Sequence, residues 1–518
     1  MGIANPSIFQ IIDWLSLPAN ERPALIMAYF DQPDTAGHFQ EVDSDVDTQL
    51  QGVDLMLNYL LNTLNSKQLL DCINIVILSD HGMKLIENRF YIDDFVDTTG
   101  MIVANGVVAR IDLNSSSMSI DELMGKLKCI NNGKLLREYS RKTIPSRYHY
   151  STSNRIGDLV LDGQLGTAIY RDRKSEFLLA ADHGYDYLGE DMRAIFFAQG
   201  PSIKKKIVLK PFQNIEYYNL FAELLGITRI PPNNGTKGRL DSVLLLGGTT
   251  VENRSSVSIA DCPSNVVEQI RNRRLQTASC QFLRNEIELS KNSGMLPPNI
   301  SSLISEQDGY NRSCLVSNNR NELMIVADST KVAKSPIYTI DILDKTEPNR
   351  INEAKSSLSC AWTGNIRRMR NDTFSYLEQF TYRSAIKFGR IVTISGPIFS
   401  KDEGLIKSNE NASTSNVEQK PSVSHVFRVL IRCTDSLWIP NGLMCKHPSN
   451  IRFAAFIMPN RPDDPNCVSS NEYLLAYSVR LRDVELLTHL EFFADRRFID
   501  RHSAVELRTD IMTNIWEV

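Results

Sequence analysis

The chain has 518 residues, 42% of them hydrophobic and 23% charged, which suits two or more buried cores and excludes a disordered or fibrous protein. Its 57 basic residues are outnumbered by 61 acidic ones and form no long basic block, so nucleic-acid binding is not expected. No apolar run is long enough to cross a bilayer, and the N-terminus lacks a basic region followed by an apolar core. The sequence therefore predicts neither a membrane span nor a signal peptide.

The first apolar run, Ala24 to Phe30, is expected to form a strand that leads into Asp34 and His38. Asp43 to Asp45 then provide capping and dipole-favourable residues for a helix. Apolar residues follow at alternating spacings of four and three, at Val46, Leu50, Val53, Leu57, Leu60 and Leu64. This spacing predicts an α-helix with one apolar stripe, and hence a strand-helix-strand unit.

Two further apolar runs end in the same way. Ile73 to Ser79 leads into Asp80-His81, and Phe177 to Ala181 leads into Asp182-His183. In a parallel sheet with crossover helices, the carboxyl ends of all strands open on one edge, so we expect the residues after the three runs to converge there. Each pair taken alone could instead be a turn that ends a strand.

These residues combine imidazole and carboxylate groups without thiolate. That mixture favours zinc in a hydrolytic site over a structural cysteine site or a calcium cage. Five or more such ligands favour a site for two zinc ions. The candidate ligands are Asp34, His38, Asp80, His81 and His183.

Three segments around the candidate ligands resemble the ecto-nucleotide pyrophosphatase/phosphodiesterase family of the alkaline phosphatase superfamily. They read Tyr-Phe-Asp-Gln-Pro-Asp-Thr-Ala-Gly-His over residues 29–38, Ser-Asp-His-Gly-Met over 79–83 and Asp-His-Gly-Tyr-Asp over 182–186. Their order and spacing agree with the family. Phe212 to Glu216 and Pro231 to Thr236 look like the family's signature near the end of the catalytic domain.

The resemblance implies a phosphodiesterase with two zinc ions that cleaves nucleotides or phospholipid-like diesters. Carried over position by position, Asp34, His38 and His183 match the ligands of one zinc, and Asp80 and His81 match two ligands of the other. Tyr29 matches an aromatic residue that packs against the base of the substrate in nucleotide-cleaving members. Tyr29 could also be an ordinary aromatic residue at a strand end.

Family members carry, earlier in the domain, a strand-end Asp that completes the second zinc site and a helix-start Thr that attacks phosphorus. Neither motif occurs here, and Thr98 and Thr99 follow the second ligand pair, which is the wrong place in the fold. We therefore expect a chain that lacks the first half of the catalytic domain and shows weak or no phosphodiesterase activity. A catalytically inactive extracellular binding or scaffold protein, and an incomplete gene model, are the alternatives.

The predicted fold class is α/β. We expect a partial alkaline-phosphatase-like sheet with crossover helices over residues 1–248, a polar surface linker over 249–300, and an α+β nuclease-like domain of the ββα type over 301–518. The first of these domains should close with a helix from Ile215 to Leu225, with Asn214 as its N-cap.

The nuclease-like domain is expected to be non-catalytic. Ile394 to Phe399, Val426 to Ile431, Phe453 to Met458 and Asp483 to Glu485 read as strands and packing elements, and no Asp-Arg-Gly-His motif accompanies them. Ser400 to Leu405 has Ser and Lys where a calcium loop needs carboxylates, so calcium is not expected.

The resemblance also implies an extracellular or cell-surface location. Asn-x-Ser/Thr sequons are compatible with it, and they lie at Asn114, Asn234, Asn253, Asn299, Asn311, Asn371 and Asn411. The resemblance suggests that C-terminal cysteines such as Cys433 and Cys445 are disulfide-bonded. Cys72, next to the second apolar run, is expected to lie in the core.

Overall fold

A computed structural model describes residues 6–39, 45–245, 304–306, 312–317, 323–328, 338–344, 373–399, 423–438, 444–460, 467–488, 490–494 and 496–518. The chain divides into two compact units. The first comprises Met1–Ile144 and Tyr150–Thr250, and the second comprises Pro145–His149 and Val251–Val518. The predicted linker over 249–300, the stretch from Ser400 to Leu405 and the sequons other than Asn114 and Asn234 lie outside the described residues.

The helices of the first unit include the two that the sequence predicts, over Val46 to Leu64 and over Ile215 to Leu225. They are α1 (Pro6–Leu15), α2 (Asp34–Phe39), α3 (Asp45–Ser66), α4 (Ile120–Leu127) and α5 (Tyr217–Leu224). The apolar stripe predicted a helix over Val46 to Leu64, and α3 confirms it. Leu60 and Leu64 are buried against Ile8, Ile11 and Ile12 of α1. Packing between α1 and α3 thus explains the helical period of the sequence.

The strands of the first unit are short and form several small sheets. They are β1 (Ile75–Leu78), β2 (Lys84–Leu85), β3 (Asn88–Tyr91), β4 (Ile102–Ala104), β5 (Val108–Asp112), β6 (Leu136–Ser140), β7 (Leu159–Gly163), β8 (Thr167–Tyr170), β9 (Ala181–Asp182) and β10 (Phe196–Gln199). β4, β5, β7 and β6 form a four-stranded sheet in that order, while β1–β10, β2–β9 and β3–β8 are pairs. The result is a mixed α/β unit.

The prediction of a parallel sheet is wrong for the three apolar runs that were expected to form its strands. β1 pairs with β10 and β9 with β2, both antiparallel, and Ala24 to Phe30 forms no strand. The third apolar run contributes only its last residue, Ala181, to β9. Ile26 and Phe30 pack against the α1–α3 cluster while Met27, Ala28 and Tyr29 between them are exposed, so this segment lacks the alternating burial of a strand. An apolar run alone does not determine whether a segment forms a strand, or with which strand it pairs.

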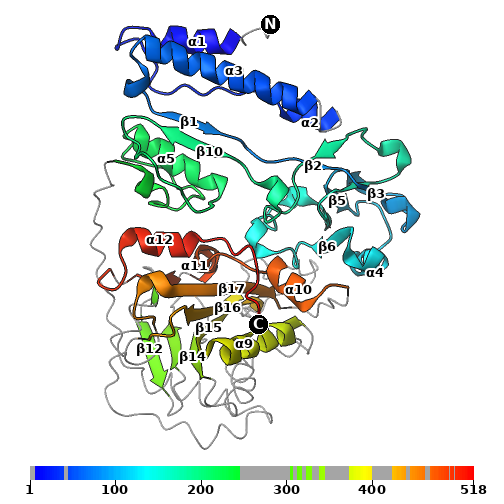
Figure 1. Ribbon diagram of the computed structural model, residues 1–518. Coiled ribbons are helices and arrows are strands. Elements are labelled where there is room, and N and C mark those ends of the chain that lie inside the picture. Colours follow the sequence, from blue (N-terminus) through cyan, green and yellow to red (C-terminus); the bar gives the residue numbers. More distant parts are fainter. Residues whose placement is uncertain are drawn as a thin grey trace, which may run out of the picture. The chain divides into compact units, whose positions relative to one another are not determined.

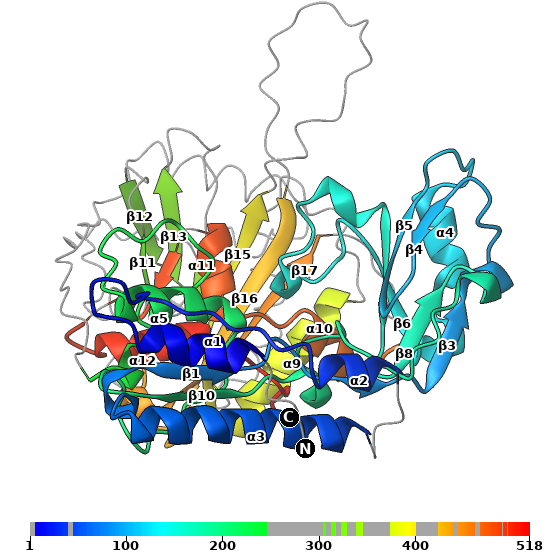
Figure 2. The same ribbon diagram turned by 90° about the horizontal axis from the view of Figure 1, so that it is seen from above.

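The β1–β10 pair lies between two helical layers of the first unit. Ile75 of β1 packs against the α1–α3 cluster, and Phe196 and Ala198 of β10 pack against the cluster that contains Leu220 of α5. Figure 1 shows β1 and β10 between α3 and α5, and Figure 2 shows the β4–β7 sheet at the end of this unit away from α1. The loop that follows β1 therefore begins from a pair packed on both sides.

The second unit is built on one antiparallel sheet with the strand order β12-β13-β14-β15-β16-β17. Its strands are β11 (Ile304–Glu306), β12 (Arg312–Ser317), β13 (Leu323–Asp328), β14 (Tyr338–Asp344), β15 (Arg390–Phe399), β16 (Val423–Cys433), β17 (Ile451–Pro459) and β18 (Leu490–Phe492). Its helices are α9 (Thr373–Phe388), α10 (Ser470–Ala476), α11 (Leu481–Thr488) and α12 (Arg501–Thr509). β16 and β17 confirm the two apolar strands predicted over Val426 to Ile431 and Phe453 to Met458, and the segment Ile394 to Phe399 lies in β15.

Helices cover both faces of this sheet. Figure 1 shows α11 and α12 on one face and α9 on the other. In β17, Phe453 and Ala455 join the cluster that contains Leu481 of α11, whereas the ring of Phe456 contacts Phe380 of α9. Alternate residues of one strand therefore enter two different cores, which is why the strand reads as a continuous apolar run.

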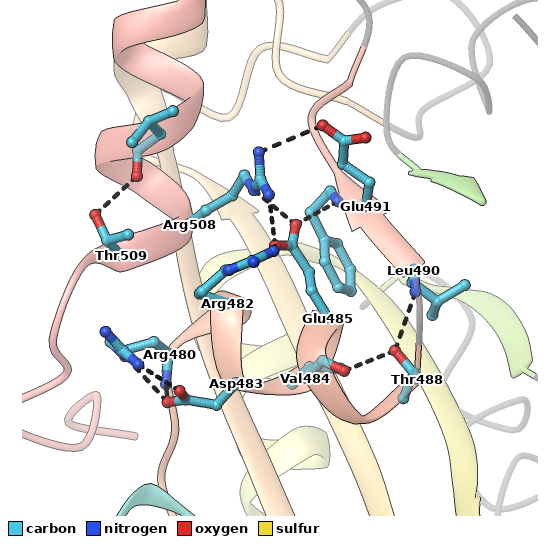
Figure 3. Close-up of polar contacts among 12 residues, drawn as sticks. Arg480, Arg482, Asp483, Val484, Glu485, Thr488, Leu490, Glu491, Arg508 and Thr509 are labelled. Atoms are coloured by element: carbon cyan, nitrogen blue, oxygen red, sulfur yellow. Dashed lines mark hydrogen bonds and ion pairs between the residues drawn. The ribbon is translucent and has the colours of Figure 1, made fainter. Parts of the chain in front are cut away.

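The second unit also holds a buried network of charged side chains, shown in Figure 3. The Nη2 atom of Arg480 lies 2.6 Å from Asp483 Oδ1, and Arg508 Nη2 donates to Glu485 at 2.7 Å. The segment Pro145–His149 belongs to this unit, where His149 Nε2 lies 2.9 Å from Asp483 Oδ1. Burial alone would raise the pKa of Asp483, but the hydrogen bonds from His149 and Arg480 outweigh it and lower that pKa.

Cysteine placement differs in part from expectation. Cys433 and Cys445 form a disulfide with each other, which connects the end of β16 to the segment before β17. Cys72 is a free, exposed cysteine, so its predicted place in the core is wrong. It lies in a short 3-10 turn, Leu70–Cys72, that precedes β1 and has no buried residue. None of the helices described above is long and apolar enough to span a membrane.

Candidate metal centre

Three segments of the first unit bring their polar residues together. α2 carries Asp34 in its first turn and His38 one turn later, so both side chains lie on the same side of that short helix. Asp80 and His81 follow β1, and His183 follows β9. The predicted convergence of these residues is therefore seen, although it does not arise at the edge of a parallel sheet.

The backbone after each of the two Asp-His pairs adopts a course that only glycine allows. A Cβ atom on Gly82 would overlap the carbonyl oxygen of Asp191, so the chain passes too close for any side chain there. Gly184 has a φ of +103°, a backbone conformation that side chains rarely adopt. Gly82 thus allows two backbone segments to approach closely beside His81, and Gly184 allows the backbone to turn after His183.

Asp34 lies at the centre of a cluster that also contains His38, His81 and His183, here called the Asp34 cluster. Its Oδ2 atom lies 3.5 Å from His38 Nε2, and its Oδ1 atom lies 3.7 Å from His183 Nε2 and 4.0 Å from His81 Nε2. Zinc bonds of ~2.1 Å in a tetrahedron place the ligand atoms ~3.4 Å apart. The separations around Asp34 are near that value, and they exceed the usual length of a hydrogen bond.

The Oδ1 atom of Asp34 is buried and accepts no hydrogen bond from any of the described residues. A buried carboxylate oxygen without a donor costs free energy unless a cation compensates it. One group of potential ligand atoms within 4.8 Å of one another comprises Asp34, His81 and His183. The donor chemistry and the unsatisfied oxygen both fit a divalent transition metal such as zinc.

The histidine rings are held from behind by backbone carbonyls. His38 Nδ1 lies 3.0 Å from Ala181 O, and His81 Nδ1 lies 2.9 Å from Gly82 O. A carbonyl at Nδ1 fixes the tautomer with the proton on Nδ1 and leaves the lone pair on Nε2. The Nε2 atoms, which face Asp34, are therefore the ones available to a metal.

The electrostatics of the site keep one imidazole neutral. The pKa of His183 is lowered, first by burial and then by the nearby ring of His81. The two rings stack with their centroids 3.5 Å apart. Metal binding requires the neutral imidazole, so the lowered pKa makes His183 a better ligand near neutral pH.

Asp80 occupies a more open position than the other candidates. Its side chain is 65% exposed, and its Oδ2 atom lies 3.5 Å from His81 Nε2. Its backbone carbonyl accepts a hydrogen bond of 2.7 Å from the side-chain amide of Asn214. The described residues place Asp80 beside His81 but outside both groups of three potential ligands.

The sequence-based prediction for Asn214 is wrong. Asn214–Glu216 form a 3-10 turn, and α5 begins at Tyr217 without a side-chain cap. The amide of Asn214 is used on Asp80 instead, so a tertiary contact replaces the local one that capping statistics suggest. The turn also buries Glu216, whose Oε2 accepts the backbone N–H of Thr236 at 2.6 Å, which joins the two later signature segments.

Two further residues complete the region. Tyr29 lies in the extended segment before α2, and its side chain is 76% exposed. Asp182 was not among the predicted ligands, yet it forms a second group of potential ligand atoms with His38 and His183. The signal was present in the sequence, because Asp182-His183 repeats the Asp-His-Gly pattern of Asp80-His81.

Comparison with known proteins agrees with these motifs. Residues 7–186 match the family described as type I phosphodiesterase/nucleotide pyrophosphatase. Two ectonucleotide pyrophosphatase/phosphodiesterases of Caenorhabditis elegans are 30% and 31% identical to 98% of the chain, over 61% and 70% of their own lengths. Ectonucleotide pyrophosphatase/phosphodiesterase family member 1 of Homo sapiens is 26% identical to 95% of the chain, over 60% of its length.

The chain thus spans less than two thirds of the first of these relatives. The match to the second one covers 70% of that protein at 31% identity, and it extends through both units of this chain. On these grounds the chain belongs to the ectonucleotide pyrophosphatase/phosphodiesterase family.

Proposed function

We propose that this chain binds zinc at the Asp34 cluster and contributes to the hydrolysis of phosphodiester or pyrophosphate bonds in nucleotides or related diesters. The observation that supports this most strongly is the carboxylate of Asp34: its Oδ2 atom lies 3.5 Å from His38 Nε2, and its buried Oδ1 atom lies 3.7 Å from His183 Nε2 and has no hydrogen-bond donor in the described part of the chain. A cation there would satisfy all three groups together.

In this proposal, Asp34, His38 and His183 hold one zinc ion, while Asp80 and His81 contribute to a second. Bound zinc supplies a Lewis acid for a phosphoryl oxygen and stabilises the negative charge that develops in the transition state. Asn214 holds the backbone at Asp80 in place, since its amide donates to that carbonyl. Tyr29, with its exposed ring, would pack against the base of a nucleotide.

We name no catalytic residue among these 518 residues, because none of them matches the family's nucleophilic Thr or the Asp that precedes it. We propose no role for calcium.

The second unit is proposed to be a non-catalytic scaffold of the nuclease-like type. Its apolar core contains side chains from β15, β16 and β17, together with α11 and α12. An extracellular location is supported by the disulfide between Cys433 and Cys445 and by the exposed sequon residues Asn114 and Asn234.

The test is the zinc content of the purified protein together with the release of nitrophenol from a nitrophenyl nucleotide ester. We expect bound zinc and release of nitrophenol, both lost in His183→Ala. His447→Ala, at an exposed histidine of the second unit, is the matched control and should change neither quantity. A wild-type protein without zinc would refute the metal proposal.

A second candidate is a catalytically inactive extracellular binding protein that keeps the metal-lined site. Stoichiometric zinc with no release of nitrophenol above the His183→Ala background would select this candidate over the hydrolase.

A further inference from the structure

Asp182 contacts the same histidine as Asp34 does, but from the opposite edge of the ring. His38 Nε2 lies 3.5 Å from Asp34 Oδ2, whereas His38 Nδ1 lies 3.9 Å from Asp182 Oδ1. The two nitrogens of an imidazole point in different directions. A cation held by Asp34 and His38 Nε2 is therefore on the far side of the ring from Asp182.

The same carboxylate also contacts the backbone of the next histidine. Asp182 Oδ1 accepts the backbone N–H of His183 at 2.8 Å. Asp182 is placed by β9, where it pairs with Lys84 of β2. One oxygen thus lies next to two of the proposed ligands, His38 and His183.

The charge of Asp182 has few other partners. Its side chain is only 18% exposed, and no lysine or arginine in the described part of the chain forms an ion pair with it. The side chain of Lys84, its neighbour across the strand pair, is instead paired with Glu87 and Asp191. A partly buried carboxylate in this situation attracts a polarised or positively charged imidazole.

We propose that Asp182 is a positioning residue of the metal centre. Its carboxylate polarises the Nδ1–H of His38, which is donated to Ala181 O, and so makes Nε2 a stronger ligand. Its hydrogen bond to the His183 backbone fixes the turn from which that imidazole projects. This inference rests on the proposed function, because it assumes that Asp34, His38 and His183 hold a metal.

The competing arrangement has Asp182 as a direct ligand, since its atoms lie within 4.8 Å of those of His38 and His183. The His38 nitrogen that lies 3.9 Å from Asp182 Oδ1 is Nδ1, and this atom is 3.0 Å from Ala181 O. The geometry points to the positioning role because Nδ1 already has a hydrogen-bond partner.

The experiment measures the zinc dissociation constant of the full chain by competition with a chromogenic chelator. Asp182→Asn keeps the shape of the side chain and removes its charge, and we expect weaker binding by about 10- to 100-fold. Asp182→Glu should recover most of the affinity. Asp97→Asn, an exposed aspartate whose carboxylate contacts Thr99, is the matched control and should bind as the wild type does.

Zinc-edge X-ray absorption on wild type and Asp182→Asn distinguishes the two arrangements. The positioning role predicts the same number and type of coordinating atoms in both proteins. An unchanged dissociation constant in Asp182→Asn, or the loss of one oxygen ligand, would overturn the inference. If the wild type itself binds no zinc, the proposed function fails along with it, whereas failure confined to Asp182→Asn leaves that function standing.

Discussion

The two units each contain a cluster of charged and polar side chains, and the clusters differ in whether they contain their own cations. In the second unit, Glu485 is fully buried, yet it accepts hydrogen bonds from Arg508, Arg482 and the backbone N–H of Phe492. In the first unit, the buried Oδ1 atom of Asp34 has no donor among the described residues. A cluster that supplies its own cations stabilises the fold, whereas the cluster around Asp34 leaves a carboxylate oxygen that a bound cation would satisfy.

The same contrast appears in the pKa values of the two clusters. In the second unit, ion-pair partners outweigh burial and lower the pKa of Asp483, which keeps this carboxylate charged. In the first unit, burial and the ring of His81 lower the pKa of His183, which keeps this imidazole neutral. Permanent charge suits an internal ion pair, and a neutral imidazole suits a metal ligand.

The largest effect should come from removing the centre of the first cluster. Asp34→Asn is expected to weaken zinc binding by about a thousandfold, the equivalent of ~4 kcal/mol, because it removes the charged ligand. The metal-free variant should unfold like the metal-free wild type, because Oδ1 makes no hydrogen bond that could be lost. Chelator competition and urea unfolding measure the two quantities. Equal zinc affinity would remove the distinction between the clusters.

The converse substitution lies in the second cluster. Arg508→Met should lower the free energy of unfolding by ~3 kcal/mol, because it removes a positive charge from the fully buried Glu485. Zinc affinity should not change. Urea unfolding followed by tryptophan fluorescence gives the first value and chelator competition the second. A variant as stable as the wild type would show that this network is not structural.

Zinc itself should stabilise only the unit that binds it. At a free zinc concentration of 100 times the dissociation constant, the expected stabilisation is ~2.7 kcal/mol, reversed by a chelator. Thermal unfolding with and without zinc measures it. Asp34→Asn should show no such shift, and an equal shift in that variant would place zinc elsewhere.

The smallest expected effect is the loss of an exposed helix cap that belongs to neither cluster. The side chain of Asp500 accepts the backbone N–H of Ser503 at 2.9 Å and caps α12. Asp500→Ala should cost about 1 kcal/mol, since an exposed cap is replaced largely by water. The same urea titration checks it. A loss as large as that of Arg508→Met would mean that burial does not set the size of these effects.

Residue periodicity in the sequence predicted individual helices and strands. The spacing from Val46 to Leu64 predicted α3, and two apolar runs predicted β16 and β17. The helix and the strands follow from helical and strand periods, which the chain expresses within a few residues. The convergence of the Asp-His pairs was also predicted, but from the edge of a parallel sheet that β1 and β9 do not form.

Features that depend on distant neighbours were not predicted. The sequence did not indicate that β1 pairs antiparallel with β10, or that the amide of Asn214 binds the backbone of Asp80 instead of capping a helix. Nor did it place Asp182 behind the ring of His38. Each depends on a residue more than a hundred positions away, where no local period carries information.

The account depends most directly on Asp34, His38 and His183 sharing one cation. A crystal structure of the full chain grown with zinc, with anomalous difference maps recorded at the zinc edge, would test this. We predict a peak within ~2.2 Å of a carboxylate oxygen of Asp34 and of the Nε2 atoms of His38 and His183. Zinc bound by only one of these residues, or a map without a peak among them, would contradict the account.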